Sequence, residues 1–386
     1  MRHLDIAIPA RWFISEAKVR IDHPEDLVFD EGSAGARRAL NAMLQAAATP
    51  HMVTIKWDGS PALIFGRDDE GFTITDKSGF NSKKAGGLPR NAGELKTMLW
   101  MRKPNDPTRE NYANSIASLW SPISRILPPS FRGFLQAHLL WNGRPTVVDG
   151  NYVFRPNKIT YSIPTDSPLG NKINNSTIGL AVHSRLGSQD DQDSKAIGSI
   201  ESIGLIPVDD VVIMGPEIKD LEHTHLPDKL RTNMQSLIKK SASKIDGFLN
   251  ASELSRNQIS DLPAKLKQYG AYRAGMGVSG FGDAANGFLN WLDTSANITE
   301  RKKEHIKKWI KEHEVGYIYT WAVADQLTKL KDYIRHDVDR QVGTSIRAAL
   351  RDQPGHEGYV ADTPSGKIKF VDRPTFMRKD SKDAVS

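Results

Sequence analysis

The spacing of apolar residues divides the chain into a strand-rich first part, a helical middle and a short strand-rich end. In the first part, short apolar runs and polar–apolar alternation are typical of strands. The predicted strands lie in MVTIKWDG and SPALIFGR, which flank a turn, and in GFTITDKSG, RGFLQAHLLW, YVFRPNKITYSI, TIGLAVHSRL and PVDDVVIMGP. One early segment has helical spacing instead. It predicts a helix from Ser33, as the N-cap, to Ala48, with Pro50 just beyond its end.

The second half of the chain changes in pattern at about residue 221. From there to about residue 350, apolar residues recur every three or four positions, as at Ile306, Trp309 and Ile310. Strand patterns return in HEGYVADT and GKIKFVDR, and a polar tail follows. We therefore predict an α+β protein with three parts: a strand-rich body over 1–215, a helical insertion over 216–350, and the end of the body over 351–386.

Composition excludes several classes of protein. The 386 residues include no cysteine, which excludes disulfide-stapled domains, cysteine-ligated zinc or iron–sulfur sites and a cysteine nucleophile. The net charge of +6 permits an anionic partner without requiring one. No apolar stretch approaches the roughly 20 residues that cross a bilayer, and the first residues lack the apolar core of a signal peptide. We predict a soluble, cytoplasmic protein without a membrane partner.

The segment Lys56-Trp57-Asp58-Gly59 is the sharpest local motif. A lysine at the end of an apolar strand can become a nucleophilic amine when burial or neighbouring positive charge disfavours its protonated form. An Asp-Gly pair allows a tight turn and close approach of the backbone to a ligand. The alternative interpretation is a hairpin turn that carries an ordinary surface lysine.

A second motif lies near the C-terminus, in Glu357-Gly358-Tyr359-Val360 and the following Lys367-Ile368-Lys369. Alternate residues of a strand share a face, so Lys367 and Lys369 are predicted to project together. Two ammonium groups on one face suit a polyphosphate, and the Glu357 carboxylate suits Mg²⁺. The alternative is a hairpin with a solvated basic face.

Taken together and in this order, the two motifs resemble those of the covalent nucleotidyltransferase superfamily. This superfamily comprises ATP-dependent DNA and RNA ligases and mRNA capping enzymes. Lys56-Trp57-Asp58-Gly59 matches its nucleophile motif K-x-D-G, Glu357-Gly358-Tyr359-Val360 its glutamate-bearing strand, and Lys367-Ile368-Lys369 its closing K-x-K motif. The serine after K-x-D-G makes the chain most similar to viral RNA ligases. The resemblance covers about 1–210 and 351–380 and implies an adenylation domain of antiparallel sheets with flanking helices.

The resemblance implies a role for each matched residue. Lys56 would be the nucleophile that carries AMP, and Glu357 would hold Mg²⁺, with Mn²⁺ as the alternative ion. The nucleotide would be bound by Thr54, Lys56, Asp58, Gly59, Lys77, Phe154, Glu357, Lys367 and Lys369. Among these, Phe154 would stack on the purine and Lys77 would replace an arginine that DNA ligases carry. The chain departs from the family near His138, where an acid is expected and Gln136 and His138 stand instead.

The implied function is an ATP-dependent polynucleotide ligase, with RNA preferred over DNA. It would join 5′-phosphate and 3′-hydroxyl ends through a lysyl-AMP intermediate, using ATP and Mg²⁺. One rival is a GTP-using capping-type guanylyltransferase. The other is a non-catalytic nucleic-acid-binding or virion protein that kept the fold. The lysines of 301–311 are a candidate contact for the polynucleotide, and a solvated helix face is the alternative.

Overall fold

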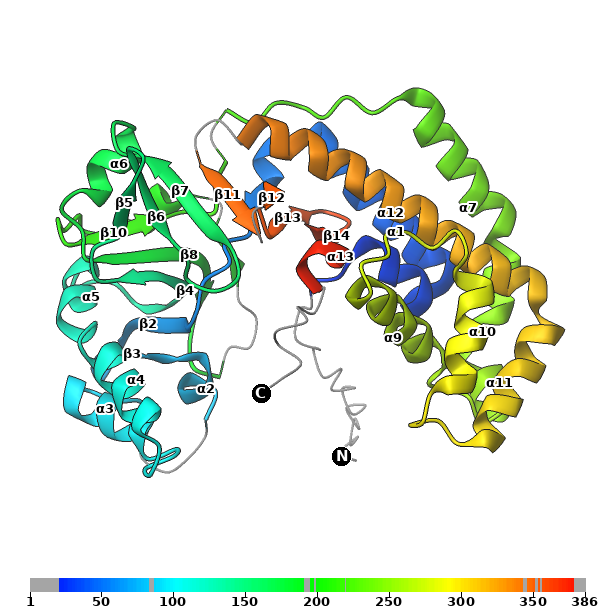
Figure 1. The fold of residues 1–386 in the computed structure, drawn as a ribbon, viewed down its shortest axis with the longest axis horizontal. Coiled ribbons are helices and arrows are strands. Elements are labelled where there is room, and N and C mark those ends of the chain that lie inside the picture. The colour runs from blue at the N-terminus through cyan, green and yellow to red at the C-terminus, as the bar shows by residue number, and fades with distance from the viewer. Residues whose placement is uncertain are drawn as a thin grey trace, which may run out of the picture.

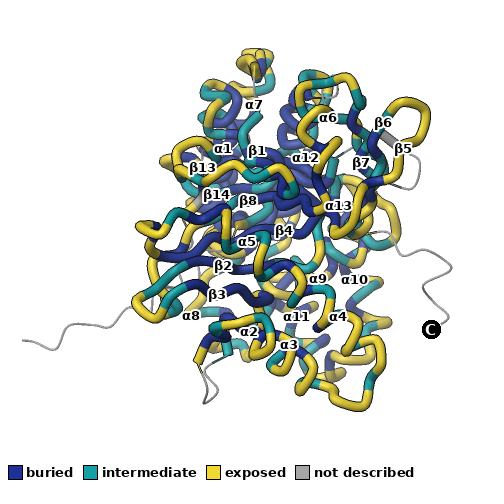
Figure 2. Tube along the Cα trace, turned by 90° about the vertical axis from the view of Figure 1, so that its left-hand side faces the viewer, coloured by how far each residue is buried: buried dark blue, intermediate teal, exposed yellow. Residues whose placement is uncertain are grey.

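The computed structural model describes residues 21–82, 87–190, 195–197, 199–218, 220–342, 346–350, 353–354 and 356–377. Over these residues the fold is mixed α and β, with open sheets (Figure 1). The strand-rich part lies on the left of Figure 1, the helices lie on the right, and a small sheet lies between them. In Figure 2 the buried stretches concentrate in the strands and in the helices that pack on them.

The largest sheet has six strands and carries most of the strand-rich body. Its order is β10-β8-β4-β2-β3, and β9 pairs with β8. The strands are β2 (Ala62–Asp68), β3 (Gly71–Asp76), β4 (Gly133–Asn142), β8 (Ile178–Leu186), β9 (Lys195–Ala196) and β10 (Val211–Met214). Apolar residues of one face pack against α3 (Ala92–Trp100), α4 (Pro107–Ala117) and α5 (Trp120–Ile126). All pairs are antiparallel except β10 with β8, so the predicted antiparallel sheets need this one correction.

Two smaller sheets complete the strand structure. A five-stranded sheet has the order β12-β11-β7-β6-β5, and a three-stranded sheet has the order β1-β13-β14. The first contains β5 (Thr146–Val148), β6 (Asn151–Phe154), β7 (Thr160–Pro164), β11 (Arg347–Leu350) and β12 (Gln353–Pro354). The second contains β1 (Val53–Ile55), β13 (Gly358–Thr363) and β14 (Gly366–Val371). Both sheets therefore combine strands from opposite ends of the chain.

The helical region shares its core with the N-terminal helix and the three-stranded sheet. A continuous apolar cluster includes residues of α1, of this sheet and of the later helices, and α12 packs along both α1 and α7. The remaining helices are α1 (Leu27–Ala48), α2 (Lys77–Phe80), α6 (Pro168–Ile173), α7 (Asp228–Phe248), α8 (Ala251–Arg256), α9 (Leu262–Gly275), α10 (Ala284–Thr294), α11 (Glu300–Glu312), α12 (Glu314–Val342) and α13 (Arg373–Met377). The predicted insertion 216–350 thus ends too late, because Arg347–Leu350 is a strand that pairs with β7.

Helix α1 corrects the predicted start of the first helix. The helix begins at Leu27. Gly32 interrupts it with φ 60° and ψ −138°, so its second, regular stretch follows Gly32 and begins near Ser33, where the sequence predicts the helix to start. Ser33 does not cap the helix with its own side chain. Its backbone N–H and its hydroxyl both donate to Asp246 of α7, each at 2.7 Å. The cap therefore comes from a residue more than 200 positions away, which sequence spacing cannot indicate.

The first two predicted strands do not pair with each other across the turn between them. β1 pairs with β13, whereas β2 pairs with β3 and β4. The Lys56–Pro61 segment therefore crosses from one sheet to another and does not close a hairpin.

No helix in the described part of the chain is long and apolar enough to cross a membrane.

Candidate active site around Lys56

Lys56 lies where the three-stranded sheet meets the six-stranded sheet. It follows β1 directly, and its backbone N–H donates to the carbonyl of Gly358 at 2.9 Å. Its ammonium forms an ion pair with Glu357, the residue before β13. Two motif residues about 300 positions apart in the sequence are thus in direct contact.

Glu357 is a buried carboxyl with 8% exposure. Burial raises its pKa above the ordinary value, and the positive charges of Lys56 and Lys369 offset only part of this rise. A carboxyl of this kind accepts a proton more readily than an exposed one.

The two lysines of the closing motif lie on one face of β14, as predicted. Lys367 and Lys369 are partly exposed, while Ile368 and Phe370 between and after them are buried. Lys369 is in register with Val360, which is in register with Thr54, so these three residues form a row across the sheet. Lys367 lies further along and pairs with Asp362 at 3.2 Å. Lys369 is therefore the lysine of this pair that acts electrostatically on Glu357.

Thr54 and Asp58 are occupied by contacts within the protein. The Thr54 hydroxyl donates to the Val360 carbonyl at 3.1 Å. The buried Asp58 carboxylate accepts from the Asn157 amide at 2.7 Å and from the backbone N–H groups of Lys158 and Ile159 at 2.7 and 2.8 Å. Asp58 thereby fixes the Lys56 segment to the loop before β7.

Gly59 and His138 seat the same segment on the six-stranded sheet. A Cβ atom at Gly59 would lie 2.5 Å from the Cβ of His138, so no larger residue fits here without displacement of the backbone. The Nδ1 atom of His138 lies 2.9 Å from the Trp57 carbonyl oxygen. Because a carbonyl only accepts, Nδ1 carries the hydrogen and Nε2 keeps its lone pair. Burial lowers the pKa of His138, which favours this neutral form.

His183 accompanies His138 on the same face of the sheet. The two rings meet edge to face with centroids 4.9 Å apart. Burial, together with His138, Lys77 and Lys56, lowers the pKa of His183 to about 3. Lys77, at the start of α2, acts on both imidazoles. The imidazoles of His138 and His183 therefore lie within the electrostatic range of both Lys56 and Lys77.

Phe154 lies in the aromatic core. Its side chain is buried, with the Trp141 ring at 4.7 Å and the Tyr161 ring stacked at 5.4 Å between centroids. Tyr161 packs on Trp57, and its hydroxyl accepts from the Asp58 backbone N–H at 2.7 Å. Phe154, which the resemblance assigns to purine stacking, thus supports the Lys56 segment through Tyr161.

A protein-family model matches residues 19–381, and its description is "Family of unknown function (DUF6267)". The chain belongs to this family. No curated protein and no solved structure matches this chain.

The sequence patterns did not single out three residues of this site. Asn157 and Tyr161 contact Asp58, and His183 packs against His138. Each lies in or next to a segment predicted as strand, but its role depends on which sheet that strand joins. Of the three, only His183 could have been noticed in the sequence, because it is a histidine among the apolar residues of the predicted strand TIGLAVHSRL.

The predicted polynucleotide contact on α11 is rich in internal ion pairs. Lys302 pairs with Asp261 and Lys303 with Glu300, both at 2.7 Å, and Lys307 pairs with Asp293. Such pairs neutralise charge that a phosphate backbone would otherwise meet. This geometry favours the alternative interpretation of a solvated, ion-paired helix face.

Proposed function

We propose that this protein is an ATP-dependent polynucleotide ligase that works through a covalent lysyl-AMP intermediate, with RNA ends as the preferred substrate. The observation that carries this proposal is the contact between Lys56 and Glu357, with Lys369 within electrostatic range. Three short motifs supply these groups, and the first is about 300 positions from the other two. Their order also matches the nucleotidyltransferase superfamily.

In the first step, the Lys56 amine attacks the α-phosphorus of ATP. An N–P bond forms, the bond to the bridging oxygen breaks, and pyrophosphate leaves. The amine must be unprotonated to attack. Glu357 touches Nζ and is the proposed acceptor of its proton before Mg²⁺ enters the site, since burial raises the pKa of this carboxyl. Lys369, Lys367 and Lys77 would offset the charge on the phosphates.

In the second and third steps, AMP passes from Lys56 to a 5′-phosphate end, and a 3′-hydroxyl then attacks that end and expels AMP. Because Nδ1 of His138 donates to the Trp57 carbonyl, Nε2 keeps its lone pair and would accept a hydrogen bond from a substrate hydroxyl.

A magnesium ion fits this site only with substrate oxygens among its ligands. No group of three or more His, Asp or Glu side chains gathers in the part of the chain that the structure describes. Asp58 is occupied by three N–H donors, so Glu357 is the residue that would hold the ion. Mg²⁺ commonly binds through one or two carboxylates, phosphate oxygens and water. When bound, it would supply charge compensation at the phosphates.

The direct test is incubation of the wild-type protein with α-labelled ATP or GTP, followed by denaturing electrophoresis. We expect label on the protein from ATP and release of AMP when RNA with a 5′-phosphate and a 3′-hydroxyl is added. Labelling by GTP alone would instead support a capping-type guanylyltransferase. Tight polynucleotide binding with no labelling by any nucleotide would support a non-catalytic binding protein.

His138 is proposed as a positioning residue for the Lys56 segment, through its hydrogen bond to Trp57. His138→Leu removes that donor, and we expect the rate of Lys56 labelling to fall by about 10²-fold while KM for ATP changes by less than about threefold. His138→Asn places an amide N–H near the position of Nδ1 and is expected to recover at least about a tenth of the wild-type rate. Equal loss in the two variants would contradict this role.

A further inference from the structure

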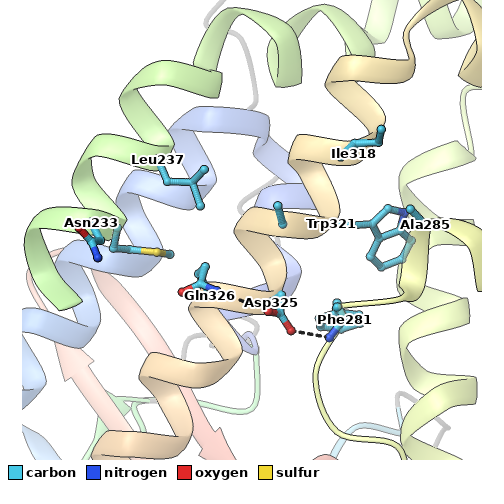
Figure 3. Close-up of a pocket in the computed structure, with 11 residues that line it drawn as sticks. Asn233, Leu237, Phe281, Ala285, Ile318, Trp321, Asp325 and Gln326 are labelled. Atoms are coloured by element: carbon cyan, nitrogen blue, oxygen red, sulfur yellow. Dashed lines mark hydrogen bonds between the residues drawn. The ribbon is translucent and has the colours of Figure 1, made fainter. Parts of the chain in front are cut away.

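A groove of about 410 Å³ lies among the helices, away from Lys56. Its floor is the exposed side of α12, α7 forms one wall, and α10 with the residues before it forms the other (Figure 3). Figure 3 shows Leu237 on the α7 side and Phe281 and Ala285 on the opposite side. The groove thus runs along α12, between α7 on one side and α10 on the other.

Most residues that line this groove are apolar. On α12, Ile318 is 49% exposed, and the small Ala322 lies one turn further along, next to the Trp321 ring and the polar Gln326. On the opposite wall, the small Gly282 and Ala285 lie beside Phe281. Small residues on a helix surface leave room for the close approach of another helix. Apolar residues at this spacing meet the apolar face of an amphipathic helix in helix-in-groove recognition.

The acid at one end of the groove is already neutralised by the protein. Asp325 accepts from the backbone N–H of Phe281 at 2.8 Å, and Lys329 pairs with it at 2.7 Å. Asp325 therefore leaves little net negative charge at this end of the groove.

The α7 edge of the groove is basic. At about 100° per residue, Lys240 and Lys244 fall on the same side of α7 as Asn233 and Leu237, which line the groove. Both lysines are exposed, and neither has an ion-pair partner among the described residues. Lys239 is also exposed but falls on a different side of the helix. Beyond the residues that line the groove, this side of α7 thus continues with two lysines that have no ion-pair partner among the described residues.

We propose that this groove binds an acidic amphipathic helix of a partner protein. The apolar face of that helix would cover Ile318 and Ala322, and its acidic side chains would face Lys240 and Lys244. This charge complementarity selects a protein helix with acidic residues over a basic one. The proposal concerns a surface separate from the Lys56 site and does not depend on its chemistry.

The test begins with a displayed library of helix-biased peptides of about 18 residues, roughly five turns. The full-length wild-type protein is the target, and the Ile318→Glu variant serves for counter-selection. Ile318 is half exposed, so this variant should keep the thermal unfolding midpoint of the wild type. We expect enriched peptides with apolar residues at i, i+3 or i+4 and i+7 and with an excess of Asp and Glu.

An enriched peptide then serves as the probe for affinity measurements. The double variant Lys240→Ala/Lys244→Ala should weaken its binding by about tenfold, while Lys239→Ala, one position away on another side of α7, should change it by less than about twofold. Enrichment of basic or uncharged peptides, no enrichment sensitive to Ile318→Glu, or equal effects of the three lysines would overturn the proposal. Concentration-dependent self-association that Ile318→Glu removes would also overturn it, in favour of a second copy of the chain.

Discussion

Replacement of Lys56 by arginine is expected to abolish transfer of label from α-labelled ATP to the protein, by at least about 10³-fold. Arginine keeps the positive charge and can still pair with Glu357, so the surroundings of the site should persist. Its guanidinium stays protonated and has no free electron pair for attack on phosphorus. Loss of label would therefore report loss of the nucleophile. Mass spectrometry of the labelled wild-type peptide should place AMP on Lys56.

The matched control is Lys172→Arg, a conservative change at an exposed lysine on α6. This variant should label like the wild type, and both variants should unfold at the wild-type temperature. Label that persists in Lys56→Arg would contradict the assignment of Lys56 as the nucleophile. Loss of label in both Lys56→Arg and Lys172→Arg would show that the effect is not specific to Lys56, and it would also contradict the assignment of Lys56 as the nucleophile.

Asp58→Ala is expected to lower the free energy of unfolding by about 3 kcal/mol. The substitution leaves the Asn157 amide and the N–H groups of Lys158 and Ile159 without their acceptor. Buried donors without a partner are costly, and hydrogen bonds to a charged acceptor contribute more than neutral ones. Chemical denaturation followed by tryptophan fluorescence measures the change, since Trp57 is the neighbouring residue.

Asp166→Ala provides the comparison for Asp58, because Asp166 is exposed in the loop after β7. Its removal should change the free energy of unfolding by less than about 0.5 kcal/mol. If Asp58→Ala also cost less than about 0.5 kcal/mol, the carboxylate would not anchor the loop. The stability measurement needs no nucleotide, so it tests the site architecture independently of the proposed ligase activity.

Much of the local structure follows from the sequence because it depends on neighbouring residues. The alternation in GKIKFVDR correctly puts Lys367 and Lys369 on one face of a strand, with Ile368 buried between them. The spacing of apolar residues likewise predicts the helical region from about residue 221, where α7 to α12 lie, and a fold that mixes helices and strands. The sequence predicts less well which strands pair with each other. The sequences of β1 and β2 are typical of a hairpin, but the two strands belong to different sheets, because β1 pairs with β13 near the end of the chain.

The individual roles of the site residues differ in how far the sequence could reveal them. Lys56 and Glu357 were both identified from their motifs, and the fold brings them into contact. The resemblance assigns Phe154 to purine stacking, and the structure shows its ring buried and stacked on Tyr161. A strand pattern gives the face of a side chain but does not say whether that face is covered. Lys302 and Lys307 show the same limit, because their acidic partners Asp261 and Asp293 lie on other segments of the chain.

The sequence by itself determined the candidate nucleophile, the carboxylate and the two lysines of β14, as well as the absence of cysteine chemistry. Residue type and short spacing are sufficient for these features. Tertiary structure alone decided that Asp58 anchors a loop, that His138 holds the Trp57 carbonyl, and that a groove with a basic edge lies on α12. These features depend on contacts between segments far apart in the chain. Such contacts are fixed by the packing of the whole core, which no local pattern encodes.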